Sequence, residues 1–101
     1  MKWLKINELN EDLKPYKNEF LMFECELDEF SKRVTKSGNL FGILIVKNGI
    51  YQTKFFLFRD DIKRFNHLNK KGKKLIIKGR PKKKRFSNDF EFKITEIHEL
   101  F

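Results

Sequence analysis

The sequence of 101 residues carries 23 Lys and Arg against 14 Asp and Glu, which gives a formal net charge of +9, and 15% of its residues are aromatic. This length suits a single domain that buries about 60 to 65% of the surface of its unfolded chain. Neither an apolar run of roughly 20 residues nor a signal-peptide core occurs, so we expect a cytoplasmic protein with no membrane contact. The single Cys25 excludes an internal disulfide, and the isolated His67 and His98 do not form a ligand pattern, so we expect no metal and no cofactor.

The segment 1–19 is predicted to form a short lead-in ahead of the main fold. Its apolar side chains recur at a spacing that favours an amphipathic helix: Trp3, Leu4, Ile6, Leu9 and Leu13. We expect this helix to begin near Asn7 and to end at Pro15, because proline lacks the amide donor that continues a helix.

The first strand is predicted over 20–34. Apolar side chains occupy alternate positions from Leu21 to Leu27, which is typical of a half-buried strand. The alternation shifts by one position at Phe30, and such a shift predicts a β-bulge or a strong bend. Acidic residues fill the intervening positions: Glu24, Glu26 and Asp28. Because an acidic row repels phosphate, we expect it on the far side or the rim of any site for a polyanion.

Two further strands are predicted between residues 40 and 58. A turn over 36–39 leads into an almost wholly apolar strand over 40–47. We expect this strand to be buried on both faces, or to be closely approached at Gly42 by another backbone. Asn48 and Gly49 predict a two-residue hairpin, after which 51–58 form the returning strand.

A short helix is predicted to follow the third strand. Asp60 or Asp61 suits its first position and Gly72 its end. Its apolar stripe consists of Ile62, Phe65 and Leu68. A fourth strand over 74–79, a basic loop over 81–89 and a fifth strand over 90–97 complete the chain. The apolar face of the fifth strand consists of Phe90, Phe92 and Ile94.

Three strands, a helix and two strands follow the element order of the OB-fold, a five-stranded Greek-key barrel that binds oligonucleotides. We therefore predict an all-β protein: a five-stranded OB-fold barrel with a short helix between strands 3 and 4 and a short helical lead-in. The whole of 1–101 is expected to be one domain, with the lead-in over 1–19 and the barrel over 20–100.

Basic residues cluster in two of the predicted connections. Six of the eight residues from Lys78 to Arg85 are basic, and a second cluster lies between the first two strands. The OB-fold binds its ligand between these two loops and across strands 2 and 3, where cations hold phosphates and exposed rings stack on bases. The predicted nucleic-acid-binding residues are Lys32, Arg33, Lys36, Phe41, Tyr51, Lys54, Phe56, Arg59, Arg80, Lys82, Lys83, Lys84, Arg85 and Phe86. The alternative for the cations is an ordinary solvated loop. The rings predicted to fill the core instead are Phe23, Phe55, Phe58 and Phe92.

Several segments resemble the OB domain of the bacterial DNA polymerase III alpha subunit. The similarity lies in the first hairpin over 34–42, the strand end over 55–58, the apolar run with a glycine over 75–80, and the last strand over 90–94. The chain departs from the family at Val46-Lys47-Asn48-Gly49, where an acidic pair is usual before the turn. The resemblance implies a non-catalytic role in holding the single-stranded template near the polymerase.

The sequence thus predicts a non-enzymatic module that binds single-stranded DNA by aromatic stacking in one basic groove, on which the two basic loops converge. Other polymerase domains or replisome proteins are expected as further partners. One alternative keeps the barrel and makes RNA the ligand, as in the anticodon-binding domains of tRNA synthetases. Another is a structural domain that docks a protein and carries its charge without binding nucleic acid. An enzyme is the least favoured hypothesis, because no Ser, Cys or His has the context of a nucleophile or general base.

Overall fold

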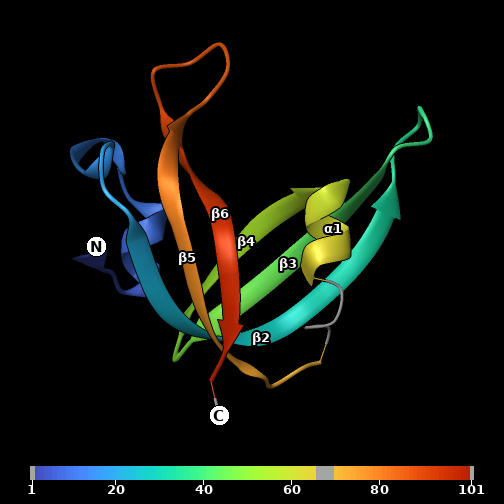
Figure 1. Ribbon diagram of the computed structural model, residues 1–101, viewed down its shortest axis with the longest axis horizontal. Coiled ribbons are helices and arrows are strands. Elements are labelled where there is room, and N and C mark those ends of the chain that lie inside the picture. Colours follow the sequence, from blue (N-terminus) through green and yellow to red (C-terminus); the bar gives the residue numbers. More distant parts are fainter. Residues whose placement is uncertain (1, 66–69, 101) are drawn as a thin grey trace.

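The computed structural model describes residues 2–65 and 70–100 (Figure 1). Within these residues, six strands, one α-helix and two short 3₁₀ helices form an all-β domain. The elements are β1 (Lys2–Trp3), η1 (Ile6–Asn10), η2 (Lys14–Tyr16), β2 (Leu21–Val34), β3 (Leu40–Asn48), β4 (Tyr51–Phe58), α1 (Asp60–Phe65), β5 (Lys74–Lys83) and β6 (Phe90–Glu99). The strand order is β4-β3-β2-β5-β6, every neighbouring pair in it is antiparallel, and β1 adds to β2 in parallel.

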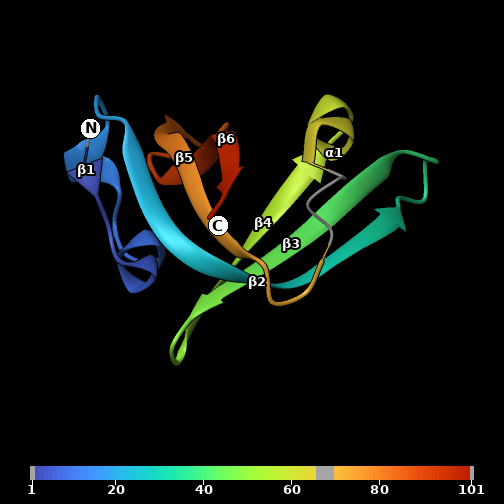
Figure 2. The same cartoon turned by 60° about the horizontal axis from the view of Figure 1, so that its bottom comes forward.

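The long strand β2 serves both halves of the sheet. Its first half, from Leu21 to Glu26, pairs with β5, and its second half, from Glu26 to Val34, pairs with β3. The register shifts between Leu27 and Glu29, which confirms the predicted bulge. Figure 2 shows β2 bending at its middle, so that β5 and β6 rise on one side and β3 and β4 on the other.

The sheet is not closed, and it has six strands where five were predicted. The end strands β4 and β6 do not pair with each other in the described residues. The lead-in supplies the sixth strand, and η1 packs against β4. There the side-chain nitrogen of Asn10 donates to the Gln52 carbonyl oxygen (3.3 Å), and the side-chain oxygen of Asn10 accepts from the Thr53 hydroxyl (3.1 Å). These contacts occupy part of the β4 edge.

The core lies in the bend between the two halves of the sheet. Phe23 is completely buried, with the ring of Phe55 at 6.0 Å and the edge-on ring of Phe92 at 5.6 Å between centroids. The prediction that these three rings are core is confirmed, although Phe92 keeps partial exposure. The lead-in contributes four further buried side chains: Leu4, Ile6, Leu9 and Leu13.

The lead-in differs from the predicted helix in three respects. It forms two short 3₁₀ turns, Trp3 is 55% exposed, and Pro15 lies within η2 instead of ending the helix. The Asp12 carboxylate accepts the Lys14 amide (2.9 Å), which starts η2 just before the proline. Pro15 is tolerated there because the first amides of a helix have no partner within it.

The strand β3 is buried on one face only, contrary to the prediction. Gly42, Leu44 and Val46 are buried, whereas the side chains between them are half-buried. A Cβ on Gly42 would lie 3.3 Å from the Phe30 ring and 3.6 Å from Ile62, so side chains approach this glycine, not another backbone.

The helix α1 begins at Asp60, so both aspartates lie within its first turn instead of at the cap position before it, where one of them was predicted. Its stripe includes the buried Ile62 and Phe65, while the predicted Leu68 lies outside the described residues. The two-residue loop after β3 consists of Gly49 and Ile50, one position later than predicted.

The hairpin of β5 and β6 is longer than predicted. Pairing continues to Lys83 opposite Phe90, which reduces the predicted loop over 81–89 to 84–89. Proline is compatible with this part of β5, because beyond Gly79 the strand has only β6 beside it. Gly79 itself is required by close packing, since a Cβ there would collide with the Lys93 carbonyl oxygen and the Phe92 ring.

Candidate nucleic-acid interface

The outer face of β2, β3 and β4 carries the largest group of exposed rings near the predicted site. The inner face is fixed by the buried Gly42, Leu44 and Val46, so the alternate residues point outward. The register then aligns three outward rows across the strands: Arg33, Phe41 and Phe58; Ser31, Ile43 and Phe56; Glu29, Ile45 and Lys54. Rings thus occupy the two rows nearest the β2–β3 turn.

We call Phe41, Phe56 and Phe58 the aromatic patch. Phe56 and Phe58 are 55% and 58% exposed, and Phe41 is half-buried between them and β2. The Phe41 ring stacks on Phe58 at 6.3 Å and 29° and meets Phe56 at 6.4 Å and 44°. The prediction that Phe58 is a core residue is therefore wrong. Phe55 and Leu57 fill the core from β4, and the alternation directs Phe56 and Phe58 outward.

Three cations border the aromatic patch. Arg33 lies in the same row as Phe41, Lys54 lies two positions before Phe56, and Arg59 follows Phe58 directly. All three are exposed, and none of them forms an ion pair with a residue that the structure describes. This end of the sheet therefore presents rings and uncompensated positive charge together.

The acidic row of β2 lies at the other end of the same strands. Lys47 sits 3.6 Å from both the Glu26 and Asp28 carboxylates, and the Gln52 amide donates to Asp28 (2.9 Å). Glu24 is exposed beyond them. These carboxylates are partly compensated. They share the outer face with the aromatic patch, because Glu26 pairs with the outward-pointing Lys47 and the exposed Glu29 lies in the row next to that of Phe56. The acidic residues therefore border the candidate site along the strands instead of lying on its far side.

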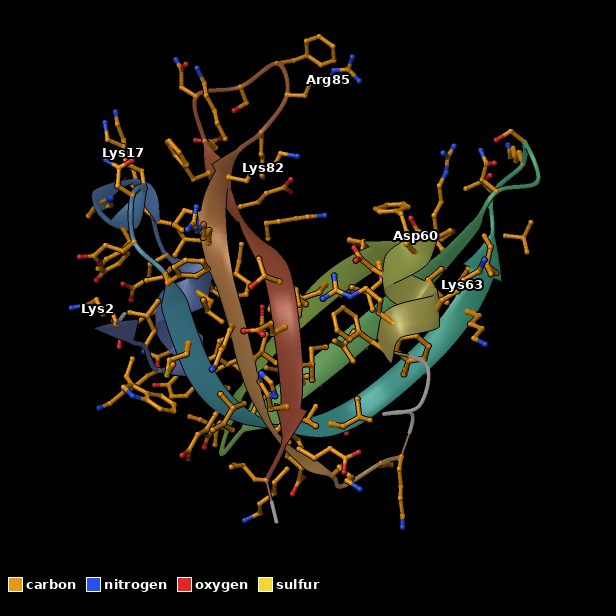
Figure 3. The ribbon with its side chains drawn as sticks, viewed as in Figure 1. Lys2, Lys17, Asp60, Lys63, Lys82 and Arg85 are labelled. Atoms are coloured by element: carbon orange, nitrogen blue, oxygen red, sulfur yellow. The ribbon has the colours of Figure 1, made fainter. Side chains whose placement is uncertain are left out.

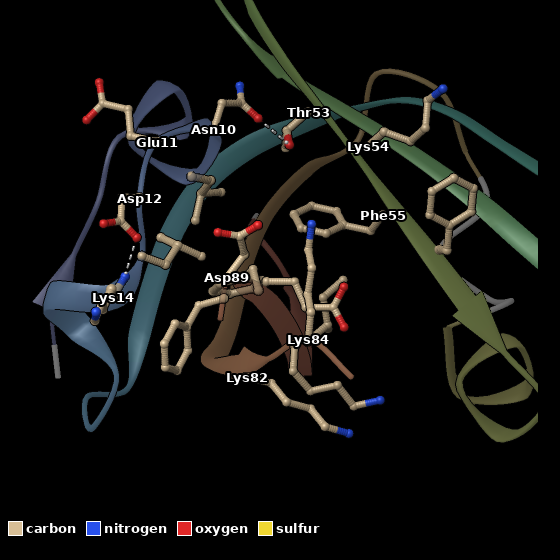
Figure 4. Close-up of a pocket in the computed structure, with 18 of the residues that line it drawn as sticks. Asn10, Glu11, Asp12, Lys14, Thr53, Lys54, Phe55, Lys82, Lys84 and Asp89 are labelled. Atoms are coloured by element: carbon tan, nitrogen blue, oxygen red, sulfur yellow. Dashed lines mark hydrogen bonds between the residues drawn. The ribbon is translucent and has the colours of Figure 1, made fainter. Parts of the chain in front are cut away.

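A cleft of about 1010 Å³ opens between the edges of β4 and β6 (Figure 4). Phe55 and Phe92 line its apolar part, and Phe56 and Phe58 reach its rim on the β4 side. Its lysines are Lys14, Lys54, Lys82, Lys84 and Lys93, and its carboxylates are Glu11, Asp12, Asp61, Asp89 and Glu91. The two signs balance, so the cleft itself is not the cationic groove that the sequence predicted.

The two basic loops do not converge. The turn after β2 and the tip of the β5–β6 hairpin lie apart at the same end of the molecule (Figure 1). Lys36 belongs to that turn. Lys32 pairs with Gly42, so it lies on the inner face of the sheet, on which α1 packs, and not on the face of the aromatic patch. The predicted site residues therefore fall into separate groups instead of lining one furrow.

The remaining predicted residues lie outside the aromatic patch. Lys82 and Lys84 line the cleft from the hairpin, and the tip carries Arg85 and Phe86. Tyr51 pairs with Asn48 at the opposite end of β4. Two of the predicted cations lie elsewhere on β5: Arg80, whose guanidinium covers the Phe20 ring at 3.8 Å, and Lys83 at the end of the strand.

Two described residues, Cys25 and His98, have side chains of a type used in catalysis. Burial raises the pKa of the Cys25 thiol to about 12, so this cysteine stays protonated and unreactive at neutral pH. His98 is exposed and lies 3.8 Å from the Glu96 carboxylate, and His67 lies outside the described residues. The described part of the chain contains no group of three residues suited to hold a metal ion.

No helix of the described chain is long and apolar enough to cross a membrane. Neither the known protein-family models nor the curated proteins include a match to this sequence. The candidate interface is therefore defined by its own geometry: the aromatic patch, three bordering cations that form no ion pair within the described part of the chain, the cleft beside the patch, and the basic hairpin on the other side of the cleft.

Proposed function

We propose that the protein is a non-catalytic module that binds single-stranded DNA on the outer face of β3 and β4. The observation that carries this proposal is the aromatic patch, in which Phe41 packs against both Phe56 and Phe58 while these two rings remain more than half exposed. Clustered apolar rings on a surface are unfavourable in water unless a partner covers them. Bases provide flat π-faces for such rings, and each stack contributes about 1 to 3 kcal/mol.

The charges around the patch favour a polyanion over a neutral apolar ligand. Arg33, Lys54 and Arg59 border the rings without an ion pair among the described residues. A phosphodiester backbone that crosses the patch would bring phosphates to these cations while its bases meet the rings. With about three phosphates neutralised, one for each cation, the slope of log affinity against log salt should be near −2 for a single strand.

We infer further that the fold is an opened variant of the OB-fold. The pairing of β2 with β3 through one half and with β5 through the other supports this, as does the helix between the third and fourth strands of the series β2 to β6. In an OB-fold, β3 and β4 correspond to the strands whose outer face binds oligonucleotides. This assignment is compatible with a role in a replicative DNA polymerase, where the module would hold the template strand.

A titration with a fluorescent oligo-dT of about 12 nucleotides, within the site sizes usual for such modules, tests the proposal. Affinity should fall between about 50 and 200 mM salt with the slope given above. Phe56→Ala should weaken binding about 5- to 150-fold, whereas the matched control Tyr51→Ala, an exposed ring outside the patch, should not. A flat salt dependence, or equal effects of the two variants, would reject the proposal. Competition by oligo-rU that is stronger than that by oligo-dT would assign the patch to RNA instead of DNA, and equal competition would show that it does not distinguish the two.

The cleft supports a second candidate, the docking of a protein partner such as another polymerase domain. Two strand edges, of β4 and β6, face it without a strand between them in the described residues. Its balanced charge and apolar floor suit a polypeptide better than a polyanion. Under this hypothesis, Lys82→Glu and Lys84→Glu would weaken capture of the partner and leave oligo-dT binding unchanged.

A further inference from the structure

The arm formed by residues 80–93 carries an exposed ring that contributes nothing to the fold. Phe86, at its tip, is 99% exposed, and its nearest aromatic or cationic contact is the Arg85 guanidinium at 5.5 Å. Its backbone has a φ of +71°, a conformation that is unfavourable for any residue with a Cβ. The exposed ring therefore contributes no burial energy that could offset the cost of this backbone conformation.

The tip is nevertheless well organised. The Lys84 amide donates to the Asp89 carbonyl oxygen (2.8 Å) and closes the loop. The Ser87 hydroxyl accepts the Asp89 amide (3.0 Å) and donates to its carboxylate (3.1 Å). At its base, the arm is fixed by Arg80 over the Phe20 ring. Phe86 is thus presented outward on a structured support, and Figure 3 shows Arg85 at this projecting tip.

Cations lie on both faces of the arm. Successive side chains of a strand point to opposite faces, so Lys83 is opposed to Lys82. Lys82 lines the cleft and Lys83 does not, whereas Lys84 lines both the cleft and a second hollow at the tip, which it shares with Lys83 and Phe86. None of the four cations from Lys82 to Arg85 forms an ion pair with a described residue. A single phosphate backbone would use the cations of one face only, but two backbones that separate around the arm would use both.

We propose that the arm acts as a wedge at a fork, the junction between duplex and single-stranded DNA. Phe86 stacks on the last base pair of the duplex, and the cations on the two faces hold the two strands as they part. Apolar side chains are known to insert between base steps in this way, and a flat terminal pair matches an exposed ring. This inference rests on the proposed function, because the single strand that leaves the fork past Lys82 and Lys84 is the strand that the aromatic patch, on the β4 side of the cleft, binds.

The chemistry of the tip favours DNA over an anionic membrane. A helix or loop that enters a lipid interface presents several apolar side chains on one face, with cations on the opposite face. Here one ring stands alone, and its neighbours on either side are Arg85 and Ser87. Binding to an anionic membrane is therefore the alternative that the vesicle experiment below decides.

The test compares three DNA probes: an oligo-dT, a blunt duplex, and a duplex with an unpaired oligo-dT tail. The wild-type protein should bind the tailed duplex more tightly than either other probe. Phe86→Ala should reduce binding of the tailed duplex about 5- to 150-fold without changing oligo-dT binding. Because Phe86 is exposed, this variant keeps the fold, and its thermal unfolding provides the check. Lys83→Glu, on the arm face away from the cleft, should weaken the tailed duplex selectively as well.

The outcomes separate the two proposals. Wild-type protein that fails to bind oligo-dT refutes the proposed function, whereas equal affinity for tailed and single-stranded probes refutes the wedge alone. An equal loss on both probes for Phe86→Ala makes Phe86 an ordinary stacking ring and overturns the wedge. Binding to vesicles of an anionic phospholipid that Phe86→Ala abolishes, with no effect on the tailed duplex, also overturns it.

Discussion

Replacing Phe58 with alanine distinguishes a surface ring from a core ring, because the two placements predict different costs. The ring is 58% exposed, so less than half of a side chain of about 200 Å² is buried, and its loss removes roughly 80 Å² of buried area. At about 25 cal/mol per Å², this lowers the free energy of unfolding by at most about 2 kcal/mol. Phe55→Ala, three positions earlier on the inner face, should lower it by about 3 to 5 kcal/mol.

For DNA binding we expect the opposite order: Phe58→Ala should cause a larger loss than Phe55→Ala. Loss of a stacking ring at position 58 weakens oligo-dT binding by about 1 to 3 kcal/mol, or roughly 5- to 150-fold. Phe55→Ala should leave the affinity of the protein that remains folded within about twofold of wild type, because Phe55 is buried on the inner face of β4, opposite the face that is proposed to bind DNA. Urea denaturation measures the first quantity and fluorescence anisotropy the second.

A loss of stability for Phe58→Ala as large as that for Phe55→Ala would place Phe58 in the core and refute the outward orientation of this face of β4. Unchanged oligo-dT affinity with a small loss of stability would confirm the exposure and refute the stacking role. The two assays therefore test the placement of the ring and its function separately.

Three further predictions concern the fold. Gly79→Ala should lower the free energy of unfolding, measured by urea denaturation, by about 2 to 3 kcal/mol, because the new Cβ collides with the Lys93 carbonyl oxygen. The control Gly38→Ala has nothing near its new Cβ, so it should cost only the strain of its φ of +86°, about 1 kcal/mol. Phe86→Gly should raise the free energy of unfolding by roughly 0.5 to 1 kcal/mol by relieving the left-handed backbone, and a loss instead would show that the ring has a structural role. The Cys25 thiol ionises near pH 9 when unfolded and near pH 12 when folded, so stability relative to Cys25→Val should fall between these values, by up to about 1.4 kcal/mol per pH unit; a constant difference would contradict the burial of the thiol.

The bend of β2 was predictable because its signal is local. The apolar positions shift by one place between Leu27 and Phe30, and the structure places the bulge there. The strands β3 and β4 were predictable for the same reason, since a turn with a glycine and runs of apolar residues define them within a few positions. The short β1 left no such signal, because two residues have no period and their pairing with Leu21 and Met22 depends on the folded lead-in.

The orientation of β4 was not predictable from its own residues. Phe55 and Leu57 alternate with Phe56 and Phe58, so both faces are equally apolar in the sequence. Pairing decides which face is inside: Leu57 lies opposite Gly42, whose inner side packs against α1 and β2. Phe56 is exposed, as a stacking ring must be, and its binding role stays a prediction; Phe58 shares this exposed face, so the prediction that it fills the core is wrong.

Whether the two basic loops converge depends on how strongly the sheet curves, and local sequence patterns do not encode that curvature. A closed barrel would bring the turn after β2 and the tip of the arm to one groove. The open sheet leaves them apart, with the charge-balanced cleft between β4 and β6 separating the two basic regions. Lysine clusters in a sequence therefore predicted where positive charge lies along the chain, but not which cations share a surface.

The most direct measurement is a backbone amide chemical-shift map of the protein titrated with oligo-dT. Binding on the outer face predicts that the largest shifts occur at the aromatic patch and its neighbours Arg33 and Lys54, with little change around Lys47 at the acidic end of the same strands. Shifts centred on the acidic end, or no saturable shifts at low salt, would contradict a single-strand site at the aromatic patch.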